Sequence, residues 1–456
     1  MLGLWKEILK GKEEKGRAVF SSFGGKEAKD GALLPASYRN CDCRGGILRA
    51  GVGLKKYLGE NGEHLAMTMD VNSAVRHTFF VTLNADGAQV NTQAVYLVGV
   101  DGYLYQRQED GSSSQKVYLG NNVSQFAMKG ENKVIYNFFC GENSVYVTVN
   151  GSEFKMITTI DNVGACICKK RCLILSKNGD LLYTSPLNPL EASGNDPDGV
   201  GTIYLPVKYG APVGIKEYKG KVYLFFERGI CKLSVSAKAT ENTLEEVGYH
   251  GGNICLRGQA VTSKGILFLA SEGAYYLRND HVERVCEHLP IGPCAAGMHC
   301  GVGYCDDLVI FSYFRERAGG TEAKRIVLYA DGKDGYFTES YGALSGNAYT
   351  YVSGKFYTFS KDGEGILRNQ QAYFLSEELF PADTKRKRLK RLVLKGEGSV
   401  TVGVQCGAAE RKYPLVFQGG VAKTRLLDRG KAFALRFYLG EGAFVSGVEI
   451  EYLTGV

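Results

Sequence analysis

The sequence predicts an all-β protein: a seven-bladed β-propeller with a small C-terminal β-sandwich and a short N-terminal helical arm. Seven stretches repeat one pattern, in which a strand of apolar or aromatic residues, a short Gly, Asp or Asn turn and a second strand follow one another. The turns recur about every 40 to 50 residues, which is the period of a propeller blade. Gly (59), Tyr (28) and Phe (22) are abundant and Pro (10) is scarce, as in chains built from strands and turns.

The propeller is predicted over residues 85–375, and residues 18–84 are expected to lead in and to supply the strands that open the ring. Large or β-branched residues alternate along KVYLFF, residues 221–226, as in a strand packed on a pleated surface. One four-stranded sheet cannot bury both of its faces, whereas seven stacked radially can. The seven predicted turns fall near Asp101, Gly141, Gly179, Arg228, Glu272, the loop 315–321 and Asp362.

Residues 1–17 are predicted to form an amphipathic helix that acts as an arm. The apolar side chains on one face of this helix are Leu2, Trp5, Ile8 and Leu9. Such an arm packs either on its own domain or on a neighbouring subunit, and both interpretations stay open.

A domain boundary is expected at EELFPAD, where Pro381 interrupts the pattern. Residues 376–391 are interpreted as a linker that carries a basic run. The alternation resumes over residues 392–456, for example in AFALRFYL and FVSGVEIEY, which predicts a β-sandwich of about five or six strands.

The basic run KRKRLKR is the main candidate binding site. It would contact DNA phosphates or an acidic partner without reading sequence, or it would simply be a solvated linker between two domains. Its basic residues are Lys385, Arg386, Lys387, Arg388, Lys390 and Arg391.

Soft metal ligands gather in one other segment of the chain. Zinc sites usually pair their ligands in short Cys-x2–4-Cys or His-x3–5-His clips, and no CxxC occurs here. We therefore expect no metal and no cofactor. The residues that come nearest to a metal-ligand spacing are Cys294, His299, Cys300 and Cys305.

The composition narrows the functional classes. A net charge of +7 does not by itself indicate a nucleic-acid-binding protein. The sequence has no apolar run of about 18 residues, so no membrane span is expected. A signal peptide is not recognisable either, so we expect synthesis in the cytoplasm and reduced thiols at the 13 Cys. Because none of the common catalytic motifs occurs, a non-enzymatic protein is expected.

Several stretches resemble one family, the β-propeller virion proteins of tailed bacteriophages, typified by the tail-nozzle or packaged-DNA-stabilisation proteins of short-tailed phages. FGGKEAKDGALLPASYRNCDCRGGILRAGVGL (23–54) is similar to the opening of the family. LLYTSPLNPLEASGNDPDGVGTIYLP (181–206) resembles its Tyr-x-Ser strand, Asn-Pro loop and following strand. Residues 211–233 and 254–289 resemble two consecutive blades, and 430–453 is similar to the closing strands.

The resemblance implies a structural protein of a phage or prophage virion. Such a protein would form a homo-oligomeric ring at the tail or at the head–tail connector, contact other virion proteins, help to seal the channel and retain DNA. It would be made in the cytoplasm of the host bacterium. Two alternatives stay open: a propeller that binds a host glycan or receptor, and a propeller glycoside hydrolase.

Overall fold

The structure is a computed structural model of the 456-residue chain, and it divides into two compact units. The two-sheet unit comprises residues 1–53, 334–339 and 369–456, and the repeat unit comprises residues 54–333 and 340–368. The residues described are 14–23, 32–39, 41–50, 71–83, 89–99, 101–107, 113–120, 123–129, 134–190, 192, 199–205, 207–236, 238–287, 289–298, 300–305, 307–338, 349–352, 355–358, 372–380, 385–440 and 442–454.

The described residues form strands, turns and three short 3-10 helices, which confirms the all-β class. The 3-10 helices are η1 (Arg44–Gly46), η2 (Val207–Tyr209) and η3 (Ala239–Glu241). No helix in this described part has the length and apolar character needed to cross a membrane.

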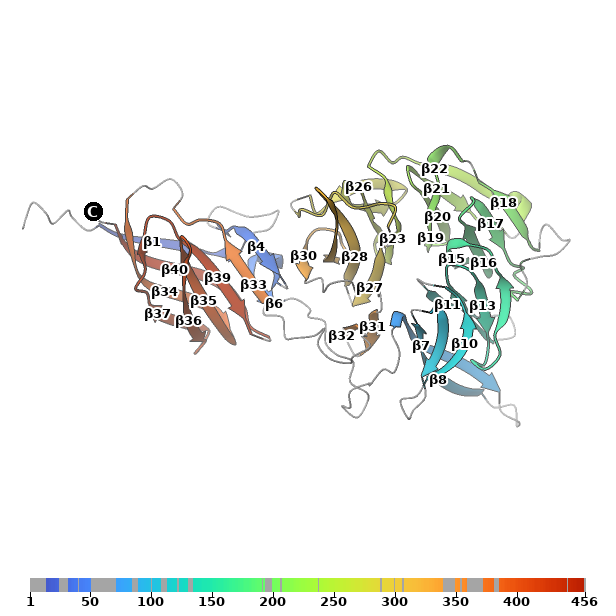
Figure 1. The fold of residues 1–456 in the computed structure, drawn as a ribbon, viewed down its shortest axis with the longest axis horizontal. Helices are drawn as coiled ribbons and strands as arrows, with labels where there is room; N and C mark the ends of the chain where they lie inside the picture. Colours follow the sequence, from blue (N-terminus) through green and yellow to red (C-terminus); the bar gives the residue numbers. More distant parts are fainter. Residues whose placement is uncertain are drawn as a thin grey trace, which may run out of the picture. The chain divides into compact units, whose positions relative to one another are not determined.

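Six four-stranded sheets and one two-stranded sheet follow one another between residues 71 and 358 (Figure 1), and within each sheet the strands are neighbours in chain order. The first three sheets are β7 (Val71–Leu83), β8 (Gln89–Gly99), β9 (Tyr103–Arg107) and β10 (Ser113–Tyr118); β11 (Ser124–Lys129), β12 (Ile135–Cys140), β13 (Val145–Thr148) and β14 (Lys155–Thr158); and β15 (Asn162–Cys168), β16 (Arg171–Ser176), β17 (Asp180–Tyr183) and β18 (Gly201–Tyr204).

The next three sheets have the same plan, and the seventh has two described strands. They are β19 (Pro212–Tyr218), β20 (Lys221–Phe226), β21 (Gly229–Ser234) and β22 (Thr243–Val247); β23 (Ile254–Thr262), β24 (Gly265–Ala270), β25 (Gly273–Arg278) and β26 (His281–Val285); β27 (Gly301–Cys305), β28 (Leu308–Arg317), β29 (Gly320–Tyr329) and β30 (Gly335–Thr338); and β31 (Tyr349–Val352) and β32 (Lys355–Thr358).

The turns expected from the sequence fall at the same place in successive sheets. Six of them join the second and third strands of a four-stranded sheet, and the seventh, near Asp362, lies outside the described residues. The first sheet begins at Val71, whereas the ring was expected to begin at residue 85. Residues 71–83 lie in the segment 18–84 that was expected to supply opening strands, and they form β7, which pairs with β8.

Consecutive sheets share their hydrophobic cores. In β20, Val222, Leu224 and Phe226 pack in the core shared with the third sheet, while Tyr223 and Phe225 pack in the core shared with the fifth. The strand is therefore buried on both faces. The first strands also contact each other in series, from β11 to β15, β19, β23, β27 and β31.

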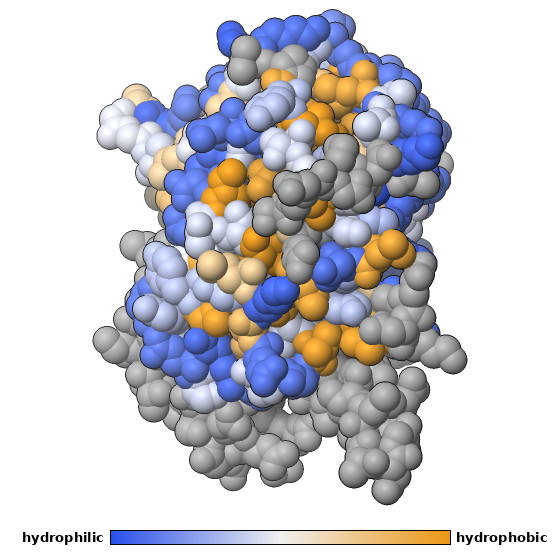
Figure 2. Space-filling view, turned by 90° about the vertical axis from the view of Figure 1, so that its right-hand side faces the viewer, coloured by the Kyte–Doolittle hydropathy of each residue, from blue (hydrophilic) through white to orange (hydrophobic). Residues whose placement is uncertain are grey.

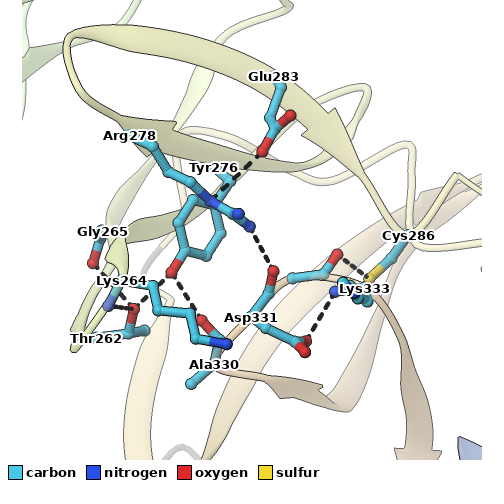
Figure 3. Close-up of polar contacts among 11 residues, drawn as sticks. Thr262, Lys264, Gly265, Tyr276, Arg278, Glu283, Cys286, Ala330, Asp331 and Lys333 are labelled. Carbon is cyan, nitrogen blue, oxygen red and sulfur yellow. Dashed lines mark hydrogen bonds and ion pairs between the residues drawn. The ribbon is translucent and has the colours of Figure 1, made fainter.

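A polar network joins the fifth sheet to the turn that follows β29 (Figure 3). The hydroxyl of Tyr276 donates a 2.7 Å hydrogen bond to the carbonyl of Ala330 and lies 2.6 Å from the hydroxyl of Thr262. The guanidinium of Arg278 lies over the Tyr276 ring, 3.8 Å from its centroid, and donates to the carbonyl of Asp331. These contacts tie neighbouring sheets together through a turn.

Two sheets share one core in the two-sheet unit. One has the order β37-β34-β40-β6-β5, with β1 paired to β40 and β38 to β34, and the other has the order β36-β35-β39-β33-β4. The strands are β1 (Glu14–Phe20), β4 (Pro35–Arg39), β5 (Cys41–Asp42), β6 (Leu48–Ala50), β33 (Ala372–Ser376), β34 (Lys387–Glu397), β35 (Ser399–Cys406), β36 (Ala409–Val416), β37 (Val421–Arg425), β38 (Arg429–Gly430), β39 (Ala434–Leu439) and β40 (Phe444–Thr454), beside the short parallel pair β2 (Ser22–Phe23) and β3 (Ala32–Leu33).

The N-terminal part of the chain differs from the prediction. Residues 14–17, expected in a helix, begin strand β1, which pairs with β40 from Glu14↔Thr454 to Phe20↔Val448. Strands β4, β5 and β6 also join the two sheets, so these strands of the segment 18–84 belong to the two-sheet unit and not to the repeat unit. The sandwich was expected within residues 392–456. The pairing of β1 with β40 was missed because it links residues 428 to 440 positions apart, and no local pattern signals it.

Among the described residues, the exposed large apolar side chains come from several different strands and loops. Figure 2 shows one face of the molecule, on which apolar residues lie among hydrophilic ones. Of the large apolar residues that the structure describes, Leu187 and Tyr204 are the most exposed, each at 81 %. Isolated exposed apolar residues are ordinary in folded proteins and need no partner.

Candidate polyanion interface

The basic run is not a linker, because its last five residues begin strand β34. Lys387 is buried, and its ammonium lies 4.9 Å from the centroid of the Phe380 ring and donates to the carbonyl of Lys385. Leu389 is fully buried in the core. The high charge of the run concealed its strand character, since the apolar alternation begins only at Leu389.

A bulge in β34 places two arginines of the run on one face. Leu389 pairs with Tyr452 and Arg391 pairs with Glu451, so Lys390 is the extra residue. Arg388 pairs with Leu453, two positions from Glu451 on β40, and side chains two positions apart share a face. Arg388 and Arg391 therefore both point away from the core that holds Lys387 and Leu389.

Neighbouring strands add further cations to this outer face. Arg391 lies between Arg425 of β37 and Glu451 of β40, and Glu451 is opposite Arg17 of β1. Lys423 lies on the same face of β37, two residues before Arg425. The basic residues on the outer face, which we call the basic face, are Lys15, Arg17, Arg388, Arg391, Lys395, Lys423, Arg425 and Arg429.

Two carboxylates balance part of this charge. Arg17 forms a 2.6 Å ion pair with Glu449, and Arg391 forms a 3.5 Å pair with Glu451. The hydrogen bond from Arg17 holds the pKa of Glu449 below its usual range, and the nearby charges of Arg391 and Lys395 act in the same direction.

Among the residues described, the other six cations have no carboxylate within ion-pair distance. A third carboxylate, Glu397, is the last residue of β34. The six are Lys15, Arg388, Lys395, Lys423, Arg425 and Arg429. Strands are about 4.8 Å apart and same-face residues about 7 Å apart along a strand, so the cations form a grid. A grid of this kind suits a polyanion such as a nucleic-acid backbone, whose charges are closely spaced, and it reads no base sequence.

The sequence found this interface only in part. Of the six basic residues in the run 385–391, only Arg388 and Arg391 lie on the basic face. Lys385 and Arg386 are exposed just before β34. Lys15, Arg17, Lys395, Lys423, Arg425 and Arg429 were missed. Alternating charge along 421–425 and 14–19 was the available signal, but only strand register shows that these positions adjoin.

Two of the four candidate metal ligands lie near a buried cysteine that the sequence did not single out. Cys294 and Cys300 are buried close to Cys255, and His299 lies outside the described residues. A hydrogen bond with Cys294 and burial raise the pKa of Cys255, and burial raises that of Cys300. Metals bind the thiolate form, which this environment disfavours. In the described part of the chain, no three potential ligands are arranged to hold a metal ion.

A pocket of about 440 Å³ lies at the end of the fifth sheet. It is lined by the β24–β25 turn, the end of β26 and the loop that leads toward β27, and its charged residues are Glu272, Arg284 and Glu287. Arg284 donates a hydrogen bond to the carbonyl of Glu272, and both residues line the pocket. The lining contains no aromatic side chain. The predicted arm residues Leu2, Trp5, Ile8 and Leu9 lie outside the described residues.

Comparison with known proteins gives only distant similarities. No family model and no curated protein matches the chain. Among solved structures, it is similar to virginiamycin B lyase from Staphylococcus aureus (10 % identity, 66 % of this chain and 96 % of that one, TM-score 0.33). It is also similar to the computationally designed Ika8 protein (10 %, 68 % and 96 %, TM-score 0.35) and to a luciferin-regenerating enzyme (9 %, 59 % and 96 %, TM-score 0.34). Similarities this weak establish neither a shared fold nor a shared function.

Proposed function

We propose that this chain is a non-enzymatic structural protein of a tailed-phage virion that holds DNA against its basic face. The observation that carries the proposal is the set of six cations without a carboxylate partner on the outer face of one sheet. Cations in such a grid bind phosphates by releasing counterions and need no base contacts. A virion protein that lines a DNA channel requires this kind of contact, and the sequence resemblance to virion proteins points to the same role.

The repeat unit is, in this proposal, a closed seven-bladed β-propeller. Contacts of β31 with both β27 and β7 support it, because they would link the last sheet to the first. The cores shared between consecutive sheets support radial packing. The two-sheet unit is proposed to be a β-sandwich, supported by the core that its two sheets share.

The protein would act in the virion as a homo-oligomeric ring at the tail or the head–tail connector, beside other virion proteins, after synthesis in the host cytoplasm. Its work would be mechanical: to close the channel and to retain DNA. The strand β1 supports a docking role for the N-terminal segment, because it fixes residues 14–20 to the sheet that carries the basic face.

The test compares two variants with the same change in net charge. The first replaces Arg388, Lys395, Lys423 and Arg425 by Thr. The control replaces Lys129, Lys177, Lys238 and Lys264, exposed residues of the repeat unit, by Thr. We expect fluorescence anisotropy near 50 mM salt to show duplex DNA binding by the wild type and the control, and at least tenfold weaker binding by the first variant. Equal loss in both variants would mean that bulk charge is responsible, and no binding by the wild type would refute the proposed DNA contact.

The pocket of the fifth sheet favours a second candidate, a module that binds a host glycan or receptor. Glu272, Arg284 and Glu287 offer polar contacts to a small polar ligand. A glycan array probed with the wild type and with Arg284→Ala tests it. Glycan binding that the substitution abolishes would support this candidate. An array that shows no binding would rule out a glycan as the ligand of the pocket.

A further inference from the structure

The pocket at the end of the fifth sheet is lined by charges of both signs. Its volume of about 440 Å³ falls within the range of about 300 to 1,000 Å³ that is usual for small-molecule sites. Its charged residues Glu272, Arg284 and Glu287 are all exposed. Among the residues described, neither carboxylate lies within ion-pair distance of the Arg284 guanidinium. A ligand that carries both charges can therefore pair with groups that do not pair with each other.

Arg284 is held at the wall of the pocket by the β24–β25 turn. It pairs with Tyr275 between β26 and β25, and its Nη2 donates to the carbonyl of Glu272. A Cβ atom built on Gly273 would lie 3.6 Å from both Nε and Nη2 of Arg284, so the guanidinium lies against this glycine. In the described part of the chain, Nε and Nη1 have no hydrogen-bond acceptor. These two donors can bind a ligand.

The two glutamates supply acceptors. The hydroxyl of Tyr275 donates a 3.3 Å hydrogen bond to Oε2 of Glu272, and no described residue donates to Oε1 or to the carboxylate of Glu287. Burial and the charges of Glu272 and Glu287 raise the pKa of Tyr275, whereas the charge of Arg284 lowers it. All three charged groups therefore surround the same tyrosine, and the pocket holds one cation beside two carboxylates.

The loop that follows β26 supplies the apolar part of the lining, including Leu289 and Ile291. Gly292 lets this loop approach the β24–β25 turn closely, because a Cβ atom built there would lie only 2.9 Å from the carbonyl oxygen of Ser271. The backbone N–H of Cys294 donates a 3.0 Å hydrogen bond to that same carbonyl. The loop is thus fixed against the turn, and the pocket is formed without a ligand.

We propose that this pocket binds an apolar α-amino acid as its zwitterion. The Arg284 guanidinium presents a planar fork that suits the two oxygens of the ligand carboxylate. Glu272 and Glu287 accept from the ligand ammonium, which has three donors to satisfy. An apolar side chain of the ligand packs against Leu289 and Ile291 and leaves water. The lining contains no aromatic ring on which a sugar could stack, which favours an amino acid as the ligand.

This inference rests on the second candidate function only in using the same pocket, and it names a different ligand for that pocket. The basic face is not involved, because it lies in the two-sheet unit whereas the pocket lies in the repeat unit. DNA binding and amino-acid binding can therefore fail separately.

The experiment compares three ligands by ligand-observed NMR titration of the full chain: L-leucine, N-acetyl-L-leucine and L-leucinamide. N-acetylation removes the ammonium charge, and the amide removes the carboxylate charge. We expect leucine to bind the wild type and each derivative to bind at least about tenfold more weakly, because each loses charge-assisted hydrogen bonds. The proposal is overturned if leucine does not bind, or if either derivative binds as tightly as leucine. These comparisons need no variant that could fail to fold.

Variants then assign the contacts to residues. Arg284→Ala should weaken leucine binding at least about tenfold and leave the weak binding of leucinamide unchanged, since leucinamide has no carboxylate to lose. Arg228→Ala is the matched control, because Arg228 is exposed in the equivalent turn of the fourth sheet. It should keep the wild-type affinity for leucine. Unchanged leucine binding by Arg284→Ala would contradict the proposal. A glycan that requires Arg284, without any leucine binding, would keep the second candidate function and overturn this inference.

Discussion

The hydroxyl of Tyr223 in β20 donates a 2.7 Å hydrogen bond to Asp280, which lies in the β25–β26 turn of the next sheet. Lys221 and Lys232 each place an ammonium 3.0 Å from the other carboxylate oxygen of Asp280. One turn aspartate therefore holds three side chains of the preceding sheet.

The joint between the fifth and sixth sheets has the same plan. Tyr276 donates to the carbonyl of Ala330, and Arg278 donates to that of Asp331, in the turn between β29 and β30. At both joints a tyrosine and a cation of one sheet bind the turn between the last two strands of the next. These polar joints lie beside the shared apolar cores and fix the relative position of neighbouring sheets.

Asp280→Asn should destabilise the protein at neutral pH by about 2 kcal/mol, at roughly 1.4 kcal/mol for each unit of pKa shift. Burial alone would raise the pKa of Asp280, but hydrogen bonds from Tyr223, Lys232 and Lys221 lower it from 3.8 to about 2. Because the folded-state pKa is depressed, this stability is complete above the unfolded pKa and is lost as the pH falls toward 2. Denaturant unfolding at pH 7 and at pH 2.5 measures the effect.

The difference between wild type and Asp280→Asn should thus shrink at the lower pH. Glu153→Gln, at an exposed site, serves as the control and should leave stability unchanged at both values. A constant difference across this pH range would show that the charge of Asp280 is not what holds the joint.

Tyr276→Phe should cost about 1 to 2 kcal/mol, because it leaves the part-buried carbonyl of Ala330 without its side-chain donor. Tyr204→Phe is the matched control, since Tyr204 is 81 % exposed. Urea unfolding of both variants provides the comparison. Equal stability of the two would contradict a role for the Tyr276 hydroxyl in joining the sheets.

Phe225→Ala should cost about 3 to 5 kcal/mol, the range for removing a large aromatic side chain from a core. Phe225 is fully buried, and its ring lies 5.4 Å from that of Phe268 in the next sheet. Leu187→Ala, at an exposed site, should change stability by less than about 0.5 kcal/mol. A loss below 1 kcal/mol for Phe225→Ala would be incompatible with the observed packing between sheets.

Local patterns predicted the repeated strands and turns but not the pairing of distant segments. Tyr223 and Phe225 alternate with Val222, Leu224 and Phe226, and each set packs in a different core, as the alternation indicated. In contrast, β1 and β40 carry no shared signal, so the role of residues 14–20 could not be read from the sequence.

The candidate interface was predicted in part for the same reason. A dense run of charge is visible at residues 385–391, and the sequence pattern led us to interpret it as a linker. In the structure Lys387 faces the core and Lys390 forms a bulge, and neither feature can be recognised from the sequence. Arg425 and Arg17 become part of the basic face only through the register of three strand pairs.

The salt dependence of DNA binding tests the central claim most directly. If the six cations of the basic face that lack a carboxylate partner engage phosphates, log affinity should fall against log salt with a slope of up to about −5, at roughly −0.9 per phosphate. Replacing Arg388, Lys395, Lys423 and Arg425 by Thr should reduce the slope to about −2, while the matched repeat-unit variant keeps the wild-type slope. A wild-type slope near zero, or a slope that the substitutions on the basic face leave unchanged, would contradict the account.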